Sequence, residues 1–220
     1  MNKLTIIVTY YNAEEYITGC LESIKQQRTQ DFNLIIVNDG STDQSKKLMD
    51  EAIKDYDKNI RFIDLDENSG HAHARNIALE EVETPYFMFL DADDELASYA
   101  ITFYLEKFND TDGLIAPIHS FTTQRPQFVD LDRVRVEYFN AKGNINSFLR
   151  KQSACNIIFR TAIVKAHHIR FNENLNTYVD WSFVLEYMKY VNKFVRIFNF
   201  PFYFRGEVYD PFETLTLRSE

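Results

Sequence analysis

The sequence predicts an α/β fold in which helices flank an open, Rossmann-like and mostly parallel sheet. The first observation is that strand-like and helix-like segments alternate four times within the first ninety residues. The second is that polar motifs follow the strands, at the edge where such sheets bind ligands. The third is size, because 220 residues with 45% hydrophobic content allow one domain with a sizeable core.

Each early element has a recognisable local pattern. Short apolar runs rich in β-branched and aromatic residues predict strands at residues 4–9, 32–37, 60–65 and 86–90. Apolar residues at helical spacing predict the intervening helices at residues 14–26, 44–56 and 70–81. A possible cap, residues 41–43 (STD), precedes the second helix.

The pattern is looser after residue 110. A polar stretch with a proline at residues 122–135 predicts a loop or an edge element. Further strands are expected at residues 114–119, 156–160, 194–198 and 201–205, and helices at residues 144–151 and 181–191. Without an internal repeat or linker, we expect a single domain over residues 1–220, made of two halves at residues 1–110 and 111–220.

Composition argues against several kinds of partner and site. The formal net charge of −9 argues against a nucleic acid partner, because a phosphate backbone needs clustered Lys and Arg. Cys20 and Cys155 lie in apolar stretches outside any CxxC or Cys/His cluster, so we expect buried thiols rather than a disulfide or zinc site. No signal peptide and no membrane-length apolar run is visible. We therefore expect a cytoplasmic protein without a membrane span. A location at the inner face of the membrane is compatible with this expectation.

Polar motifs follow the first two predicted strands. Residues 9–17 (TYYNAEEYI), at the end of the first strand, contain a strand-to-helix turn of the kind that exposes backbone N–H groups to a ligand. In residues 38–43 (NDGSTD), Asp39 could accept a hydrogen bond from an N–H such as the uracil imide, and Gly40 permits a tight turn. Taken alone, this second stretch is better explained as a common turn followed by a helix cap.

A third motif, residues 68–76 (NSGHAHARN), follows the third strand. Gly70 would let the backbone approach a ligand, and Arg75 is placed on a helix where it could meet a phosphate. His71 and His73 are two positions apart and so point to different helix faces, which is poor geometry for one metal ion. We assign these histidines no catalytic role.

Two acidic motifs carry the expected chemistry. Asp91-Ala92-Asp93-Asp94 directly follows an apolar strand, and carboxylates crowded there are costly unless a cation neutralises them. Hard oxygen ligands select Mg²⁺ or Mn²⁺, which then bridges a diphosphate, although a solvated acidic turn is an equal alternative for this motif alone. Asp180 opens an amphipathic helix, where it is either a helix cap or a general base.

These motifs, in this order, resemble the inverting glycosyltransferase family 2 with its A-type (GT-A) nucleotide-sugar-binding fold. The resemblance runs from Thr5 to about Arg205. The sequence is also similar, in general character, to bacterial wall teichoic acid glycosyltransferases. The resemblance implies a nucleotide-sugar-binding first half, an acceptor-side second half, a UDP-sugar donor and a hydroxyl acceptor such as a teichoic-acid-like polymer or another glycan.

The resemblance further implies roles for individual residues. Uridine and its phosphates would contact Thr9, Tyr11, Asp39, Asn68 and Arg75. Asp91 would lie at the ribose or the metal, and Asp93 would bind Mn²⁺ or Mg²⁺. Asp180 would be the base in a single inverting displacement.

The sequence departs from the family at two positions. Val179 stands where many relatives have Glu before the base. The stretch from Arg205 contains no His, which several relatives use there as a further metal ligand. That ligand could be replaced by Glu207 or Asp210, or by diphosphate and water. These departures favour one alternative, a domain that binds nucleotide or glycan without turnover inside a larger polymer-synthesis protein.

Two other enzyme classes are excluded by missing motifs. A nicotinamide dehydrogenase would carry G-x-G-x-x-G after the first strand, where this chain has no glycine. A nucleotidyltransferase would usually carry a Gly-rich basic loop near the N-terminus for a triphosphate, which is also missing.

Overall fold

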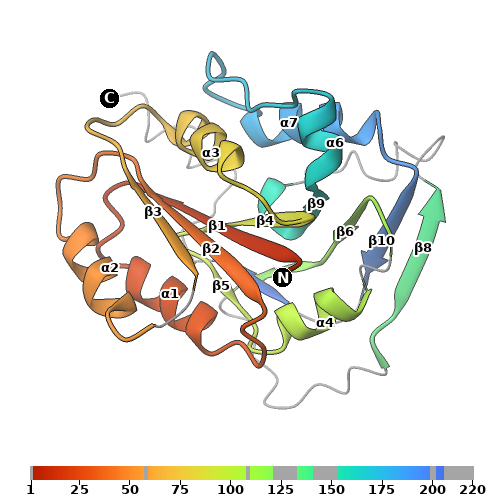
Figure 1. Ribbon diagram of the computed structural model, residues 1–220, viewed down its shortest axis with the longest axis horizontal. Helices are drawn as coiled ribbons and strands as arrows, with labels where there is room; N and C mark the ends of the chain where they lie inside the picture. The colour runs from red at the N-terminus through yellow and green to blue at the C-terminus, as the bar shows by residue number, and fades with distance from the viewer. Residues whose placement is uncertain are drawn as a thin grey trace.

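The computed structural model describes residues 2–56, 59–107, 110–120, 133–140, 153–198 and 202–205. Within these residues, the strands form an eight-stranded sheet with the order β3-β2-β1-β4-β9-β6-β10-β8 and a three-stranded sheet with the order β5-β11-β7. Figure 1 shows the helices packed around the larger sheet. The predicted α/β class, with a mostly parallel sheet flanked by helices, is confirmed.

The first half is a parallel sheet with helical crossovers. Its strands are β1 (Leu4–Tyr10), β2 (Phe32–Asn38), β3 (Ile60–Asp64) and β4 (Tyr86–Asp91). Its helices are α1 (Ile17–Lys25), α2 (Ser45–Ile53) and α3 (His71–Glu80). The chain steps outward from β1 to β3 and then returns to β4, so right-handed connections place α3 on the opposite face from α1 and α2 (Figure 1).

The second half extends this sheet with strands of mixed direction. Strand β9 (Ile157–Arg160) lies antiparallel between β4 and β6 (Gly113–Ile115), and β10 (Lys193–Ile197) and β8 (Val136–Asn140) follow. The smaller sheet contains β5 (Glu95–Leu96), β7 (Ile118–Ser120) and β11 (Tyr203–Arg205). The remaining helices of the described ranges are α4 (Ala100–Lys107), the 3-10 turn η2 (Ala154–Asn156), α6 (Thr161–Ala166) and α7 (Val179–Met188).

Some sequence predictions for the second half were wrong. The single strand expected at residues 114–119 is two strands, β6 and β7, which belong to different sheets and are separated by Ala116 and Pro117. Proline has no N–H to continue a ladder, so the chain leaves one sheet there. Helices α4 and α6 were not predicted. The helix expected at residues 144–151 and most of the loop at residues 122–135 lie outside the described residues.

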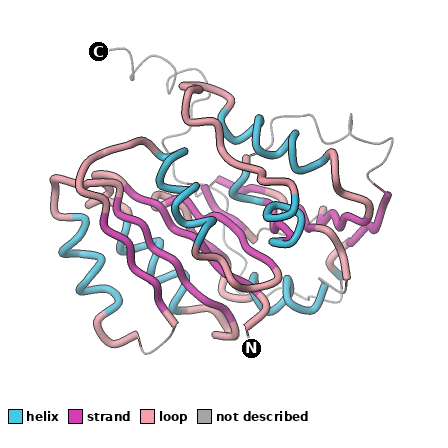
Figure 2. The backbone as a smooth tube through the Cα atoms, turned by 45° about the horizontal axis from the view of Figure 1, so that its top comes forward, coloured by secondary structure: helices cyan, strands magenta, loops and turns pink. Residues whose placement is uncertain are grey.

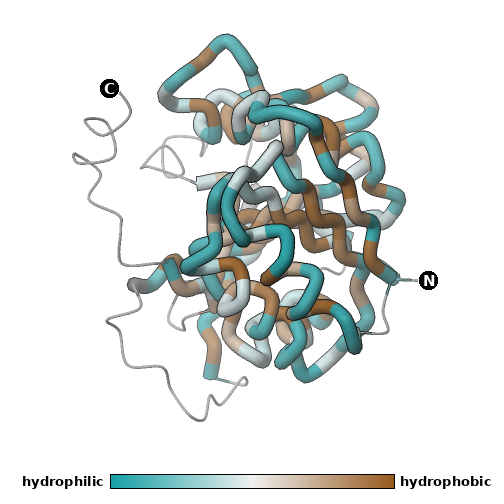
Figure 3. The backbone as a smooth tube through the Cα atoms, turned by 90° about the vertical axis from the view of Figure 1, so that its left-hand side faces the viewer, coloured by the Kyte–Doolittle hydropathy of each residue, from teal (hydrophilic) through white to brown (hydrophobic). Residues whose placement is uncertain are grey.

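The apolar core follows the central strands. Figure 2 shows the strands running side by side through the molecule, with helices and loops outside them. Figure 3 shows apolar residues concentrated along these strands and polar residues in the surrounding loops. Strands β1 and β4 are buried along almost their whole length. None of the helices in the described ranges combines the length and apolar character needed to cross a membrane.

Candidate active site

The acidic turn after β4 gathers three carboxylates. Asp91, Asp93 and Asp94 each offer an oxygen atom, and these oxygens lie within 4.8 Å of one another. Asp93 is exposed, Asp91 is half-buried and Asp94 is buried. A compact set of carboxylate oxygens, part of it open to solvent, fits a hard cation such as Mg²⁺ or Mn²⁺. The donor set therefore fits the metal that the sequence predicts.

A tyrosine from the smaller sheet holds this turn in place. The Tyr203 hydroxyl donates to Asp94 Oδ2 at 2.6 Å and accepts from the Asp91 backbone N–H at 3.3 Å. Burial raises the pKa of Tyr203 well above its ordinary value, so the hydroxyl stays a neutral donor. Nothing in the sequence pattern pointed to Tyr203, because a contact across 112 residues leaves no local signal.

The charge on the acidic turn is only partly compensated. Solvent reaches Asp93, yet the protein atoms crowded around it and the neighbouring Asp91 carboxylate both disfavour its ionised form. Arg205 and Arg75 act in the opposite direction, and the net result is a raised pKa for Asp93. A bound cation would relieve this repulsion.

Arg75 of α3 lies between two acidic residues. Its Nη2 donates to Asp91 Oδ1 at 2.6 Å, and its Nη1 donates to Asp180 Oδ1 at 2.5 Å. Arg75 is 4% exposed. Burial alone would lower the pKa of Arg75, but Asp180 and Asp91 raise it well above its ordinary value. Arg75, expected from the sequence to meet a phosphate, engages two carboxylates in the structure, and its contact with a phosphate stays a prediction.

Asp180 is held from two sides and does not cap its helix. The N-cap of α7 is Tyr178, which makes no capping bond through its side chain. Asp180 Oδ2 accepts from the Ala154 N–H at 2.9 Å and from Ser153 Oγ at 3.1 Å. Burial would raise the pKa of Asp180, but Arg75 and the Ala154 N–H outweigh it and lower the pKa. The carboxylate is therefore an ionised acceptor directed into the site.

Asp39 ties two of the predicted motifs together. Its carboxylate accepts hydrogen bonds from the backbone N–H groups of Ser69 at 2.8 Å and Gly70 at 2.9 Å. Asp39 is 3% exposed. These bonds give Asp39 a structural role that the sequence did not reveal, because its partners come from the next strand-end loop. Its predicted contact with uracil stays a prediction.

The other predicted donor contacts lie at the same edge of the sheet. Thr9, near the end of β1, is paired in register with Val37 on one side and Asp91 on the other. Tyr11 is exposed at the start of the following turn. Asn68 accepts from the Gly70 N–H at 3.1 Å within the third loop. The strand ends thus bring Thr9 beside the acidic turn and leave Tyr11 open to solvent.

Both cysteines are buried free thiols, as predicted. The Cys20 thiol donates a long, weak hydrogen bond to the Asp91 carbonyl oxygen at 3.6 Å, and Cys155 Sγ accepts from Arg75 at 3.4 Å. Burial raises the pKa of both thiols. These cysteines therefore pack beneath the acidic turn and are poor nucleophiles.

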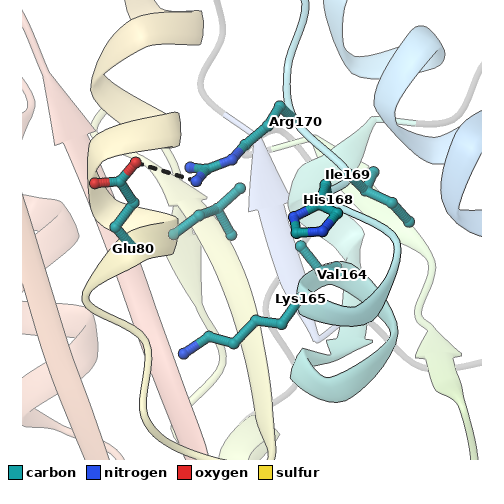
Figure 4. A pocket seen from close by; sticks show the side chains of 7 residues that line it. Glu80, Val164, Lys165, His168, Ile169 and Arg170 are labelled. Carbon is teal, nitrogen blue, oxygen red and sulfur yellow. Dashed lines mark hydrogen bonds and ion pairs between the residues drawn. The ribbon is translucent and has the colours of Figure 1, made fainter.

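A cavity of about 270 Å³ lies between α3 and α6 (Figure 4). Arg170 donates to Glu80 across its mouth at 3.0 Å. None of the predicted site residues lines this cavity, so it is separate from the strand-end site. Its lining consists of Leu79, Glu80, Val164, Lys165, His168, Ile169 and Arg170.

Comparison with known proteins adds a family and several relatives. The model of a family described as glycosyl transferase family 2 matches residues 5–168. The chain is 97% identical over 220 residues to a teichoic acid poly(glycerol phosphate) polymerase of Staphylococcus epidermidis, all of the chain matching 30% of that relative. The chain therefore spans less than a third of this relative's length.

A second relative has both sequence and structural similarity. This is the poly(ribitol-phosphate) beta-N-acetylglucosaminyltransferase TarS of Staphylococcus aureus, 28% identical over 204 residues, with 84% of this chain matching 32% of TarS. A crystal structure of TarS residues 1–349 with UDP-GlcNAc superimposes with a TM-score of 0.79 at 23% identity, covering 93% of this chain and 58% of that one.

A more distant structure shares the fold. It is the mannosyltransferase PcManGT of Pyrobaculum calidifontis, in complex with GDP-Man and Mn²⁺. It superimposes with a TM-score of 0.65 at 15% identity, covering 87% of this chain and 53% of that one. This similarity supports the architecture alone.

Proposed function

Because the chain belongs to glycosyl transferase family 2, we propose that it transfers a sugar from a UDP-sugar to a hydroxyl group, with inversion at the anomeric carbon. One observation carries this proposal. A single buried arginine contacts Asp91, on the cation side of the site, and Asp180, the candidate base, at 2.6 and 2.5 Å. The two kinds of acid that such a displacement needs therefore lie on either side of one guanidinium.

In this proposal the donor lies across the ends of β1, β2 and β4. Thr9, Tyr11, Asp39 and Asn68 contact the uridine and its phosphates. Asp93 holds Mn²⁺ or Mg²⁺ with the help of Asp91, and the bound cation supplies positive charge for the leaving diphosphate.

The acceptor lies on the other side of Arg75. Asp180 accepts the proton of the acceptor hydroxyl as the oxygen forms its bond to the anomeric carbon and UDP leaves. The lowered pKa of Asp180 keeps this carboxylate ionised and ready to accept. One displacement needs no covalent intermediate, so the site requires no nucleophile of its own.

The names of the relatives suggest the acceptor. One relative is named for poly(glycerol phosphate) and the other for poly(ribitol-phosphate). Each glycerol unit of a glycerol phosphate chain uses two of its three hydroxyls in phosphodiester links and keeps the third free. We propose this free hydroxyl as the acceptor, and a cytoplasmic location at or near the inner membrane face belongs to the same proposal.

A second candidate is a domain that binds nucleotide or polymer without turnover. The specific observation in its favour is the 97% identical relative, which is named a polymerase and of which this chain matches 30%. The chemistry in that name could belong to the other part of the longer protein. The intact carboxylates at positions 91, 93 and 180 favour transfer over binding alone.

UDP release distinguishes the two candidates. The chain is incubated with UDP-glucose, UDP-GlcNAc or UDP-galactose, with and without Mn²⁺ and with synthetic poly(glycerol phosphate). We expect release of UDP that depends on both Mn²⁺ and polymer for at least one sugar. UDP binding without release from any donor would contradict transfer and support the binding module.

A further inference from the structure

We propose that Arg75 is a positioning residue that fixes the spacing between the cation side of the site and the catalytic base. This inference rests on the proposed function and deepens it. It gives Arg75 a role that differs from the phosphate contact implied by the family resemblance. The observations are its two carboxylate partners, its burial and the unequal occupation of the carboxylate oxygens.

The guanidinium joins three elements that are distant in sequence. Arg75 belongs to α3, Asp91 ends β4 and Asp180 lies in the first turn of α7. The partners are 16 and 105 residues away from Arg75 along the chain. A planar guanidinium presents its N–H groups in a rigid fork, so it fixes the direction as well as the distance of each partner.

Aromatic rings hold the guanidinium itself in place. The Arg75 Cζ atom lies 5.3 Å from the ring centroids of both Phe89 and Phe171. Phe171 stacks on Phe183 of α7 with ring centroids 4.1 Å apart. Arg75 is therefore locked between β4 and the segment that carries the base. Because Arg75 is 4% exposed and already engages two carboxylates, little of its guanidinium is open to a phosphate.

The hydrogen bonds leave one free position on each side. Within the described residues, Asp180 Oδ2 accepts from Ser153 and Ala154, whereas Oδ1 accepts from Arg75 alone. A carboxylate oxygen has two lone pairs, so a substrate hydroxyl would donate to Oδ1, beside the guanidinium. On the other side Arg75 occupies Asp91 Oδ1 and leaves Oδ2 for a cation. Arg75 thus determines which oxygen of each acid faces the substrates.

Lysine at this position tests the role of the fork. A lysine keeps the positive charge, but its compact ammonium cannot hold two carboxylates in one plane. Arg160→Lys is a matched control, because Arg160 also bonds two aspartates, Asp112 at 3.1 Å and Asp110 at 3.3 Å, outside the site. Calorimetry measures UDP affinity with Mn²⁺, and steady-state UDP release measures kcat.

We expect Arg75→Lys to lower kcat by roughly 100-fold, the typical cost of a small misplacement of reacting groups. UDP affinity should stay within about threefold of wild type, since Asp93 and the uridine contacts stay in place and Arg75 does not contact the donor in this proposal. Arg160→Lys should leave both quantities unchanged. Loss of UDP affinity in step with kcat would make Arg75 a donor ligand and overturn the proposal, and so would an unchanged kcat.

Two further measurements keep the test decisive. If thermal unfolding shows that Arg75→Lys does not fold, the double variant Arg75→Lys/Asp180→Asn takes its place, because it has one buried charge fewer. Retained UDP affinity of this double variant supports the proposal, and lost UDP affinity overturns it. If the wild-type chain releases no UDP, the proposed function fails separately. Crystal structures then decide, because Asp91 and Asp180 carboxylates that keep their spacing in Arg75→Lys overturn the positioning role.

Discussion

At the scale of single residues, the site places opposite demands on its acids. Asp93 has a raised pKa because the crowded protein around it and Asp91 disfavour its charge, whereas Asp180 has a lowered pKa because Arg75 and a backbone N–H outweigh burial. The first acid gains from a cation, and the second is already stabilised as an anion. Such a separation of pKa values between neighbouring acids is typical of acids with different tasks.

Asp180→Asn is predicted to abolish transfer while preserving the donor site. The change is isosteric but removes the proton acceptor, which is worth roughly 10²–10⁴ in rate for a general base. UDP affinity should stay near that of wild type, because the base faces the acceptor. The transfer rate and UDP affinity are measured on one preparation. Transfer near the wild-type rate would remove Asp180 from the chemistry, and loss of both properties would indicate damaged structure.

Asp93→Asn is predicted to remove most of the metal dependence of UDP binding. In the wild-type chain UDP should bind more tightly with Mn²⁺ than in EDTA, because diphosphate and the acidic turn repel each other until a cation lies between them. Calorimetry of both proteins under both conditions gives the comparison. Equal affinity of the wild-type chain with Mn²⁺ and with EDTA would rule out the metal site.

At the scale of elements, the donor side of the site depends on contacts between loops. Asp39, after β2, accepts from the N–H groups of Ser69 and Gly70, after β3. Gly40 makes this approach possible, because a Cβ atom there would lie 2.4 Å from the Glu67 carbonyl carbon. Gly40 also has a φ of +66°, which side chains disfavour. The two loops are therefore fitted to each other through one glycine.

Gly40→Ala is predicted to weaken UDP binding by at least about tenfold, an effect of roughly 1.4 kcal/mol. The new methyl group must push the third loop away, which breaks the bonds of Asp39 and moves Asn68. Ser41→Ala is the matched control, since Ser41 lies in the same turn as Gly40. This change removes only the exposed hydrogen bond that the Asn12 N–H donates to Ser41 Oγ. Calorimetry measures both variants. Wild-type affinity of Gly40→Ala would show that this loop contact does not shape the donor site.

The candidate base and the acidic turn depend on a different pair of elements. Ser153 and Ala154, in and beside η2, hold one oxygen of Asp180, and Tyr203 of β11 holds the acidic turn. Both supports come from the second half of the chain, whereas Asp91 and Arg75 come from the first. Neither half could form the complete site alone.

At the scale of the whole molecule, strand β9 and an aromatic cluster join the two halves. Strand β9 pairs with β4 from the first half and with β6 from the second. Phe159 of β9 is fully buried and lies against several rings from both halves. Its ring neighbours are Phe87, Phe89, Phe183 and Tyr187. We therefore expect the two halves to unfold together.

Phe159→Ala is predicted to lower the free energy of unfolding by about 3–5 kcal/mol, the usual cost of removing a buried phenylalanine ring. Calorimetric melting should still show one transition, at a lower temperature. Tyr138→Ala is the control, because Tyr138 is 59% exposed and its loss should change stability by less than about 0.5 kcal/mol. A first half that still melts at the wild-type temperature would mean that the halves are independent.

The sequence by itself determined the α/β class and the order of the first seven elements. Their patterns are local, since an apolar run or a helical spacing depends on neighbouring residues. The sequence also placed polar motifs at strand ends, and parallel topology then brings strand ends to one edge. Three carboxylates in the four residues from Asp91 to Asp94 were visible in the same way.

Only the tertiary structure decided what these residues contact. It gave Arg75 two carboxylate partners, tied Asp39 to the third loop, and divided residues 114–119 between two sheets. Each of these outcomes depends on strand order and register across long stretches of chain. A sequence pattern reports how a segment is built, but hydrogen bonds across 16 to 112 residues form only when packing brings their donors and acceptors together.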